Sequence, residues 1–300
     1  MNYSKHEMSE VNISVFYNDK QWPDLLTNAI NPFIHNNFHQ LGLQFYAIHF
    51  NDKRGLSITT SFKGSKDAVR KISQRADVHF SDFLSSNPSE DQPMHFPAEG
   101  LFINFPNNCI RFNVLNTNAI LINTVSEHRL SRLIENHVQK FSLLLPKIVE
   151  EDTNYILGSR FFLAIQLHLL LIYALYSTTV DARSCTNSFY KYIDRFSEDH
   201  KARMLKDVNR VYEIYREELV DHCANIWSAP SVEVNSEEAW QQDWLEISNQ
   251  TIAALKEHNI EPLVIEENTT TLIHSLNHQL NIKKGVSILL LISKVLEDLK

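Results

Sequence analysis

Glycine is scarce in this sequence, with only 6 residues in 300, and no two of them are adjacent. Dinucleotide-binding folds and P-loops both need closely spaced glycines, because their backbone must approach the phosphates. Neither motif can be written anywhere in the chain. The sequence therefore offers no site for a nucleotide, and we expect no cofactor.

Concentrated positive charge is also missing. The chain has 28 Lys and Arg against 36 Asp and Glu, a net charge of −8, and the basic residues form no long run. Proteins that bind nucleic acids or anionic membranes neutralise phosphates with clustered Lys and Arg. We therefore expect no DNA or membrane partner, and tRNA binding is disfavoured.

Only three cysteines are present, Cys109, Cys185 and Cys223, and none forms a C-x-x-C pair. Such spacing fits a reducing compartment and buried, inert thiols. The N-terminus lacks the apolar run of a secretory signal. The most apolar stretch, Phe161–Leu175, is shorter than the roughly 20 residues that span a bilayer and contains Gln166 and His168. The sequence predicts a cytoplasmic protein.

The chain can nevertheless bury a sizeable hydrophobic core, because 43% of its residues are hydrophobic. The first part alternates apolar and polar residues, as half-buried strands do, whereas the chain after about residue 126 has a helical period. We expect an α+β fold: an N-terminal antiparallel sheet with flanking helices, followed by a mostly helical part. The chain reads as a single domain, 1–300, with a strand-rich lobe at 1–125 and a helical lobe at 126–300.

The sequence also predicts a β-hairpin. Two extended runs, Gln44–Phe50 and Leu56–Phe62, are joined by NDKRG, whose Asp and Gly are typical of hairpin loops. A strand is expected at Val11–Tyr17, helices at Trp22–Leu41 and Ser65–Leu84, and a second hairpin at Leu101–Phe105 and Cys109–Val114. The helices expected later are Glu127–Val149, Ser159–Ser177, Thr186–Phe196, Glu198–Trp227, Glu237–His258, Thr269–Leu280 and Val286–Leu299.

Two histidine pairs have the i, i+4 spacing that places side chains on one face of a helix. His35 and His39 lack a third metal ligand, so surface or structural roles are favoured and no metal is expected. His274 and His278 lie among apolar positions that would turn one imidazole inward. An inward histidine beside a cleft could transfer protons, whereas a hydrogen-bonded structural histidine is the simpler alternative.

The hairpin and its neighbours carry cations that could hold a carboxylate, namely His49, Lys53, Arg54, Lys63 and Arg111. Simple solvation of these charges is the alternative. Trp227, Trp240 and Trp244 are expected to pack in a core rather than line a peptide groove. No serine, cysteine or paired-carboxylate motif for catalysis can be identified.

Two segments resemble one protein family. The segment FYAIHFNDKRGLSITTSF at Phe45–Phe62 follows a predicted helix, and TLIHSLNHQL at Thr271–Leu280 precedes a last apolar helix. Both resemble segments of the C-terminal glutamate-elimination domain of lantibiotic dehydratases, which also occurs alone in thiopeptide-type bacteriocin biosynthesis proteins. The order and spacing of the two segments extend the resemblance over essentially the whole chain.

The resemblance implies an α+β domain that acts on a ribosomally synthesised precursor peptide. Its chemistry would be lyase-type: removal of glutamate from a glutamylated Ser or Thr, or a pyridine-forming [4+2] cycloaddition of two dehydroalanines that expels the leader peptide. His274 matches the family's histidine and is the expected general acid or base, while His278 and Gln279 stand where Asn and Arg are usual.

The sequence departs from the family on the hairpin, where His49, Ser57 and Thr59 stand in place of three arginines. Neither Ser nor Thr can supply the positive charge that a bidentate hold on glutamate needs. We expect Ser57 and Thr59 to donate hydrogen bonds at the catalytic site, and Arg54, His49, Arg111 and His278 to bind substrate. Glutamate elimination is thereby disfavoured relative to cycloaddition.

Two other interpretations stay open. In the first, the chain is a non-catalytic subunit of a split dehydratase, which binds a precursor or leader peptide by strand addition and works beside a glutamylating subunit. In the second, it is an unrelated α+β protein, because short motifs recur by chance. The expected partner is thus a precursor peptide, and the assembly could include a homodimer.

Overall fold

The computed structural model describes residues 8–90, 104–114, 128–153, 156, 160–176, 178, 182–183, 196–228, 239–257, 262–282 and 285–299. The chain forms two compact units. The first comprises Met1–Arg160 together with His278–Asn281, and the second comprises Phe161–Asn277 and Ile282–Lys300. The boundary predicted at residue 125 lies where the sequence changes from strands to helices. The boundary between the compact units lies later, so that the helix His128–Glu151 belongs to the first unit.

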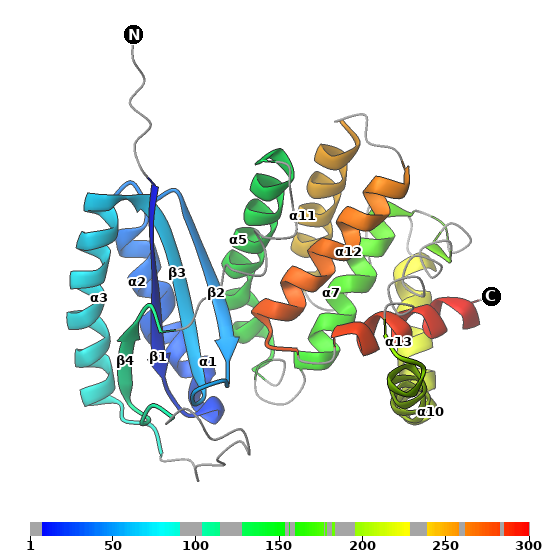
Figure 1. Ribbon diagram of the computed structural model, residues 1–300, viewed down its shortest axis with the longest axis horizontal. Coiled ribbons are helices and arrows are strands. Elements are labelled where there is room, and N and C mark those ends of the chain that lie inside the picture. Colours follow the sequence, from blue (N-terminus) through cyan, green and yellow to red (C-terminus); the bar gives the residue numbers. More distant parts are fainter. Residues whose placement is uncertain are drawn as a thin grey trace. The chain divides into compact units, whose positions relative to one another are not determined.

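The first unit is built on an antiparallel sheet with the strand order β2-β3-β1-β4 (Figure 1). Its strands are β1 (Met8–Phe16), β2 (Phe45–Asn51), β3 (Ser57–Ser65) and β4 (Cys109–Phe112). The predicted first strand and hairpin are confirmed. Cys109–Phe112 is a strand as expected, but it pairs with β1, and residues 101–103 of its predicted hairpin partner lie outside the described part.

Helices cover the apolar face of this sheet (Figure 1). They run as α1 (Trp22–Leu25), a π-helical segment η2 (Leu26–Ile30), α2 (Asn31–Asn37) and α3 (Lys66–Ser86), after a short 3-10 turn η1 (Asp19–Gln21). Phe33 packs at 5.0 Å from the ring of Phe80 and 6.2 Å from that of Phe62, which joins α2, α3 and β3 in one core. The predicted helices are thus confirmed.

The helix expected over Trp22–Leu41 is helical from Trp22 to Asn37 and widens to a π-helix just before Pro32. Proline has no N–H and its ring clashes with the preceding turn of an α-helix. A wider turn relieves that conflict without ending the helix. Pro32 therefore stands two residues after the end of this local change in winding.

One helix closes the outer edge of β2. This helix, α5 (His128–Glu151), places the Ser142 Oγ 2.9 Å from the backbone N of Ile48. The side chain of Gln279 reaches the same residue, with its Nε2 at 3.2 Å from the Ile48 carbonyl oxygen. Both outward backbone groups of Ile48 are thereby paired, as buried backbone groups require.

The second unit is helical. Its helices are α7 (Arg160–Leu175, from Phe161 onward), α10 (Glu198–Ser228), α11 (Ala239–Lys256), α12 (Pro262–Gln279, up to Asn277) and α13 (Gly285–Asp298). They confirm five of the expected helices, with α12 beginning earlier than predicted, and the helix expected at Thr186–Phe196 falls almost wholly outside the described residues. No helix in the described part is long and apolar enough to cross a membrane.

Buried tryptophans organise this unit. Trp240 and Trp244 are fully buried, and the indole N–H of Trp244 donates to the Leu167 carbonyl at 2.9 Å. These two residues confirm the expected core role. Cys223 is also buried as expected, and burial raises the pKa of its thiol to about 12, which makes it unreactive. Cys109 is only partly buried, and Cys185 lies outside the described residues.

Candidate functional site

A row of polar residues crosses the sheet of the first unit. Thr59 on β3 lies opposite His49 on β2 and, on its other side, opposite Ser14 on β1. Ser14 in turn lies opposite Arg111 on β4. Residues that are directly opposite in neighbouring strands project from the same face. Each of the four strands thus contributes one polar side chain to a single row. Three of these side chains, those of His49, Thr59 and Arg111, belong to predicted site residues.

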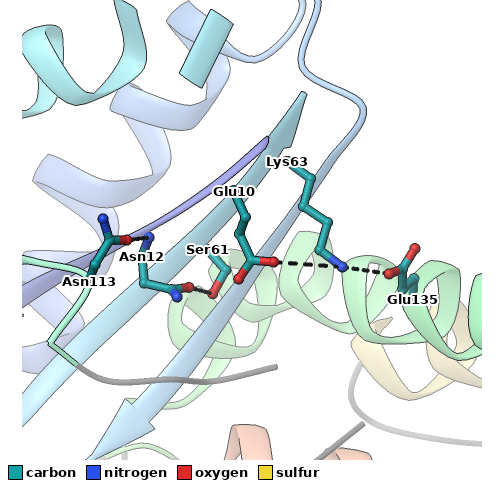
Figure 2. Close-up of polar contacts among 6 residues, drawn as sticks. All are labelled: Glu10, Asn12, Ser61, Lys63, Asn113 and Glu135. Atoms are coloured by element: carbon teal, nitrogen blue, oxygen red, sulfur yellow. Dashed lines mark hydrogen bonds and ion pairs between the residues drawn. The ribbon is translucent and has the colours of Figure 1, made fainter. Parts of the chain in front are cut away.

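Polar side chains continue on this face in the rows on either side. One neighbouring row contains Asn51 opposite Ser57, and the other contains Ser61 opposite Asn12. Figure 2 shows how Ser61 bonds to Asn12, whose backbone N–H donates to the Asn113 side chain at 2.9 Å. Across β1, β2 and β3, this face is therefore both polar and buried, with Ser14, Ser57 and Thr59 each fully inaccessible to solvent, whereas Arg111 on β4 is exposed.

The two hydroxyls expected at the catalytic site differ in their surroundings. The Thr59 Oγ1 lies 2.9 Å from the Ser14 Oγ and accepts a hydrogen bond from the Asn51 Nδ2 at 3.1 Å. The Ser57 Oγ, by contrast, is buried with no hydrogen-bond partner within the described residues. A buried hydroxyl without a partner is costly, so Ser57 is the hydroxyl available to a ligand, while Thr59 belongs to a structural network.

Two imidazoles stand beside these hydroxyls. The ring centroids of His49 and His278 are 5.7 Å apart, with an angle of 75° between the planes. Within the described part of the chain, the two ring nitrogens of His49 have no hydrogen-bond partner. The same is true of the Nδ1 of His278. The structure thus brings together two residues that sequence predicted separately as substrate-binding.

Both imidazoles are held neutral by burial. His49 is completely buried, and desolvation, assisted by the neighbouring His278, lowers its pKa to about 3. Burial also lowers the pKa of His278, and the positive charge of Lys53 lowers it further. A neutral imidazole carries one N–H donor and one acceptor. This part of the site therefore offers neutral hydrogen-bonding groups where the resembled family has a cationic arginine.

Positive charge is present at one end of this face. The Arg54 guanidinium lies 4.1 Å from the centroid of the Phe105 ring, and that of Arg111 lies 5.3 Å from the same centroid. The backbone N–H of Phe105 donates to the Arg54 carbonyl at 2.8 Å. The structure thus gathers the two arginines predicted to bind substrate around one aromatic ring, where both attract its π face.

Gly55 makes this close approach feasible. Its φ of +112° is a conformation that other residues rarely adopt, and a Cβ there would lie 3.2 Å from the Phe105 carbonyl oxygen and 3.3 Å from the Phe16 ring. The hairpin loop can therefore pass directly beside Phe105 only with glycine at this position.

Lys63 does not join these cations. Its Nζ lies 2.6 Å from Glu135 Oε1 and 3.9 Å from Glu10 Oε2, so that it is bracketed by two carboxylates (Figure 2). It is six residues beyond Ser57 on β3, or about 20 Å along the strand. Lys63 is therefore a structural ion-pair residue that connects β1, β3 and α5.

His274 belongs to the second unit. Burial lowers its pKa, and it in turn contributes to lowering that of His168, which desolvation brings down to about 4. His168 is fully buried, and its Nε2 lies 2.9 Å from the Asn277 Oδ1. The helical unit thus contains a cluster of neutral polar groups around α12 that sequence reasoning missed, apart from His274.

The end of α12 is fixed by a motif with a clear sequence basis. Asn281 has a φ of +55°, its N–H donates to the His278 carbonyl, and the N–H of Ile282 donates to that of Asn277. This is a Schellman cap, in which Asn is the usual substitute for Gly. The cap holds the turn that carries His278 and Gln279.

The histidines of the first predicted pair, His35 and His39, are exposed on and just after α2. In the part of the chain that the structure describes, no group of three or more His, Cys, Asp or Glu residues is arranged to hold a metal ion. Sequence reasoning also missed Ser14 and Asn51, although their alternation with apolar neighbours along β1 and β2 was a visible signal.

Several solved structures have a fold similar to that of this chain. The chain superimposes on TbtD, a pyridine synthase from thiomuracin biosynthesis, with a TM-score of 0.67 and 13% identity over 96% of this chain and 98% of that one. TsrL gives 0.58 and 14% over 97% and 95%. The tRNA-dependent lantibiotic dehydratase MibB from Microbispora sp. 107891 gives 0.51 and 9%, over 99% of this chain but 28% of that one.

No model of a known protein family matches the sequence, and no curated protein matches it significantly. At these identities the likeness is one of fold. The resemblance drawn from two short segments is confirmed at that level, and the whole chain, not only those segments, has the fold of these proteins.

Proposed function

We propose that this chain is a stand-alone tailoring protein in the biosynthesis of a ribosomally synthesised, post-translationally modified peptide, and that it acts on a glutamylated or dehydrated precursor by lyase-type chemistry. The observation that carries the proposal is the fold shared with a thiomuracin pyridine synthase over nearly the full length of both chains. Because fold alone does not fix function, the side chains of the polar face must support the same assignment.

Between the two lyase reactions, the polar face favours pyridine-forming cycloaddition over glutamate elimination. A glutamyl substrate brings a carboxylate, and a buried carboxylate needs a cation beside it. The residues aligned with the family's arginines are His49, Ser57 and Thr59, which are fully buried and uncharged. Dehydroalanines and their amides are neutral, and hydroxyl and imidazole groups suit them.

Each site residue then has a role in the proposal. Ser57 and neutral His49 hydrogen-bond the reacting amides, and His278 supports them from the adjacent position. Thr59 holds the geometry of the strand through Ser14 and Asn51. Arg54 and Arg111, stacked on Phe105, bind a carboxylate or backbone carbonyls of the peptide outside the reacting residues. His274 matches the family's histidine and is the general acid or base of the proposed reaction.

Intact mass spectrometry of the cognate precursor peptide, already glutamylated or dehydrated, tests the proposal. Loss of the leader peptide with ring formation supports cycloaddition, and loss of glutamate alone would instead establish elimination. The His274→Ala variant should lose turnover, whereas His200→Ala, which removes an exposed histidine from α10, should retain it. Unchanged turnover in His274→Ala would remove that residue from the mechanism.

A second function is favoured by the same buried, uncharged residues. If the missing arginines mark a lost reaction, the chain is a non-catalytic subunit that binds the precursor or leader peptide for a separate glutamylating dehydratase subunit. Its signature is tight peptide binding without any change in peptide mass. A homodimer would be compatible with either function and can be measured in the same preparation by light scattering.

A further inference from the structure

A hollow of about 540 Å³ opens between α2 and α3 in the first unit. Phe33 and Asn37 of α2 line one side of it. The other side is lined by six residues of α3, namely Lys71, Gln74, Arg75, Val78, His79 and Asp82. Val78 is 63% exposed at this hollow. Because one exposed valine is ordinary on a protein surface, the charges around it decide what the hollow can bind.

The charges of α3 are segregated along the helix. Between residues 70 and 82 the basic residues come first and the acidic residues follow, and all of them are exposed: Arg70, Lys71, Arg75, Asp77 and Asp82. Lys71 and Arg75 have like charges one turn apart, which slightly destabilises a helix. Neither aspartate stands three or four residues from a Lys or Arg, the spacing at which opposite charges stabilise a helix. The pattern therefore does not stabilise α3 itself.

The charges at both ends of the hollow are available to another molecule. Among the described residues, Lys71 and Asp82 form no ion pair. Arg75 contacts two neutral acceptors, because its Nη1 donates to the Asn37 Oδ1 at 2.7 Å and to the Gln40 Oε1 at 2.6 Å. These contacts leave its charge uncompensated, so the hollow has a positive end and a negative end.

The lining residues of α3 are related in pairs about the point midway between residues 76 and 77. Lys71 lies as far before this point as Asp82 lies after it, and the same holds for Arg75 and Val78. A two-fold rotation about an axis through this point reverses the helix, so it sets Lys71 of each copy opposite Asp82 of the other. A parallel arrangement would instead set Lys71 beside Lys71. Because a two-fold interface requires a self-complementary patch, the charges favour antiparallel pairing of two copies.

The same rotation gives the patch an apolar centre with a charged rim. Lys71 and Asp82 are about three helical turns apart, or roughly 16 Å along α3. Val78 lies between them and, in the antiparallel pair, faces the hollow of the other copy. An uncharged centre surrounded by polar and charged residues is typical of protein–protein interfaces.

We propose that the hollow between α2 and α3 is the interface of a two-fold homodimer, in which a second copy of this chain packs its α3 antiparallel to the first. Lys71 of each copy pairs with Asp82 of the other, and Val78 of each copy contacts the hollow of the other. The inference goes beyond the proposed function and does not depend on it, because it rests on the surface of these two helices alone.

Light scattering coupled to size-exclusion chromatography, with sedimentation equilibrium for the dissociation constant, tests this interface. The mass of the parent protein should rise with concentration from 34.8 kDa toward twice that value. Lys71→Glu and Asp82→Lys should each weaken dimerisation roughly tenfold or more, because each replaces two attractive contacts by repulsive ones. Lys206→Glu and Asp221→Lys make the same changes at exposed positions of α10 and should leave the dimer unchanged.

Charge exchange tests the antiparallel register. The double variant Lys71→Glu/Asp82→Lys should dimerise like the parent, and an equimolar mixture of the two single variants should form heterodimers, because one then supplies only carboxylates and the other only ammonium groups. Circular dichroism checks that each variant is folded. A parent that stays monomeric, or single variants that dimerise as the parent does, would overturn the proposal. Monomeric single variants that neither the mixture nor the double variant restores would show that Lys71 and Asp82 do not pair.

Discussion

The side-chain amide of Gln279 occupies the outer edge of β2, with its Nε2 at 3.2 Å from the carbonyl oxygen of Ile48. The same nitrogen lies 3.1 Å from the Val138 carbonyl and 3.1 Å from the Ser142 Oγ. Gln279 stands where the resembled family usually has an arginine. In this chain the position serves to join a helix end, a sheet edge and α5.

We therefore expect Gln279→Leu to destabilise the protein. The substitution leaves the Ile48 carbonyl buried without its donor, which costs on the order of 1–3 kcal/mol. Urea unfolding followed by circular dichroism measures this change. Gln250→Leu is the matched control, because Gln250 is exposed on α11 and its Nε2 donates to the exposed Glu246 side chain at 3.1 Å, so its replacement should change stability by no more than about 0.5 kcal/mol.

Ser57 and Thr59 should separate activity from stability. Thr59→Val removes the hydroxyl that Ser14 and Asn51 share, so the free energy of unfolding should fall by about 1–3 kcal/mol. Ser57→Ala deletes an unpartnered hydroxyl and should leave stability nearly unchanged while lowering the turnover number. Equal effects of both variants on urea midpoint and turnover would contradict the distinction.

Acid should destabilise the protein through its buried histidines. The pKa of His49 is about 3 in the folded protein and that of His168 about 4, whereas an unfolded histidine titrates near 6.5. Between these values the unfolded state binds more protons, so stability falls as the pH falls, by up to about 1.4 kcal/mol per pH unit for each group. The contribution is complete above pH 6.5.

Replacing His49 by Leu should flatten this dependence between pH 6 and 4, as urea titrations at each pH would reveal. Ser57→Ala serves as the control, because it alters a buried neighbour on the same face without removing a titrating group. A slope that is the same in His49→Leu as in the parent would show that His49 does not become neutral on folding.

The paired arginines should act on substrate affinity. Arg54→Gln and Arg111→Gln each remove a charge from the Phe105 ring, and we expect KM for the precursor peptide to rise roughly 10-fold or more with little change in kcat, since a charged hydrogen bond contributes about 1.5–3 kcal/mol. Arg70→Gln on α3, whose side chain is 67% exposed, is the control. A fall in kcat without a change in KM would instead assign these arginines to the chemical step.

Much of the fold was readable in the sequence because it rests on local rules. The loop NDKRG with Gly55 specified a hairpin, alternation specified β1, and three-and-four spacing specified most helices. These signals depend only on neighbours along the chain. The pairing of β4 with β1 could not be read from the sequence in this way, because it joins residues about a hundred positions apart.

The candidate site was only partly readable. Residue type and family resemblance indicated Ser57, Thr59, His49 and His278, since their positions match motifs. The sequence could not tell that Thr59 is saturated by Ser14 and Asn51 while Ser57 is left without a partner. Hydrogen-bond saturation is decided by cross-strand register, and register is a property of the assembled sheet.

By itself, then, the sequence determined which residue types and which local elements are available. It has few glycines, uncharged residues on the hairpin where the resembled family has arginines, and histidines at helical spacing. Only the tertiary structure decided which of them meet. It stacked Arg54 and Arg111 on one ring, diverted Lys63 to two carboxylates and buried His49 as a neutral imidazole. The physical reason is that charge state, partner and access depend on distances in space, which the order of residues constrains only locally.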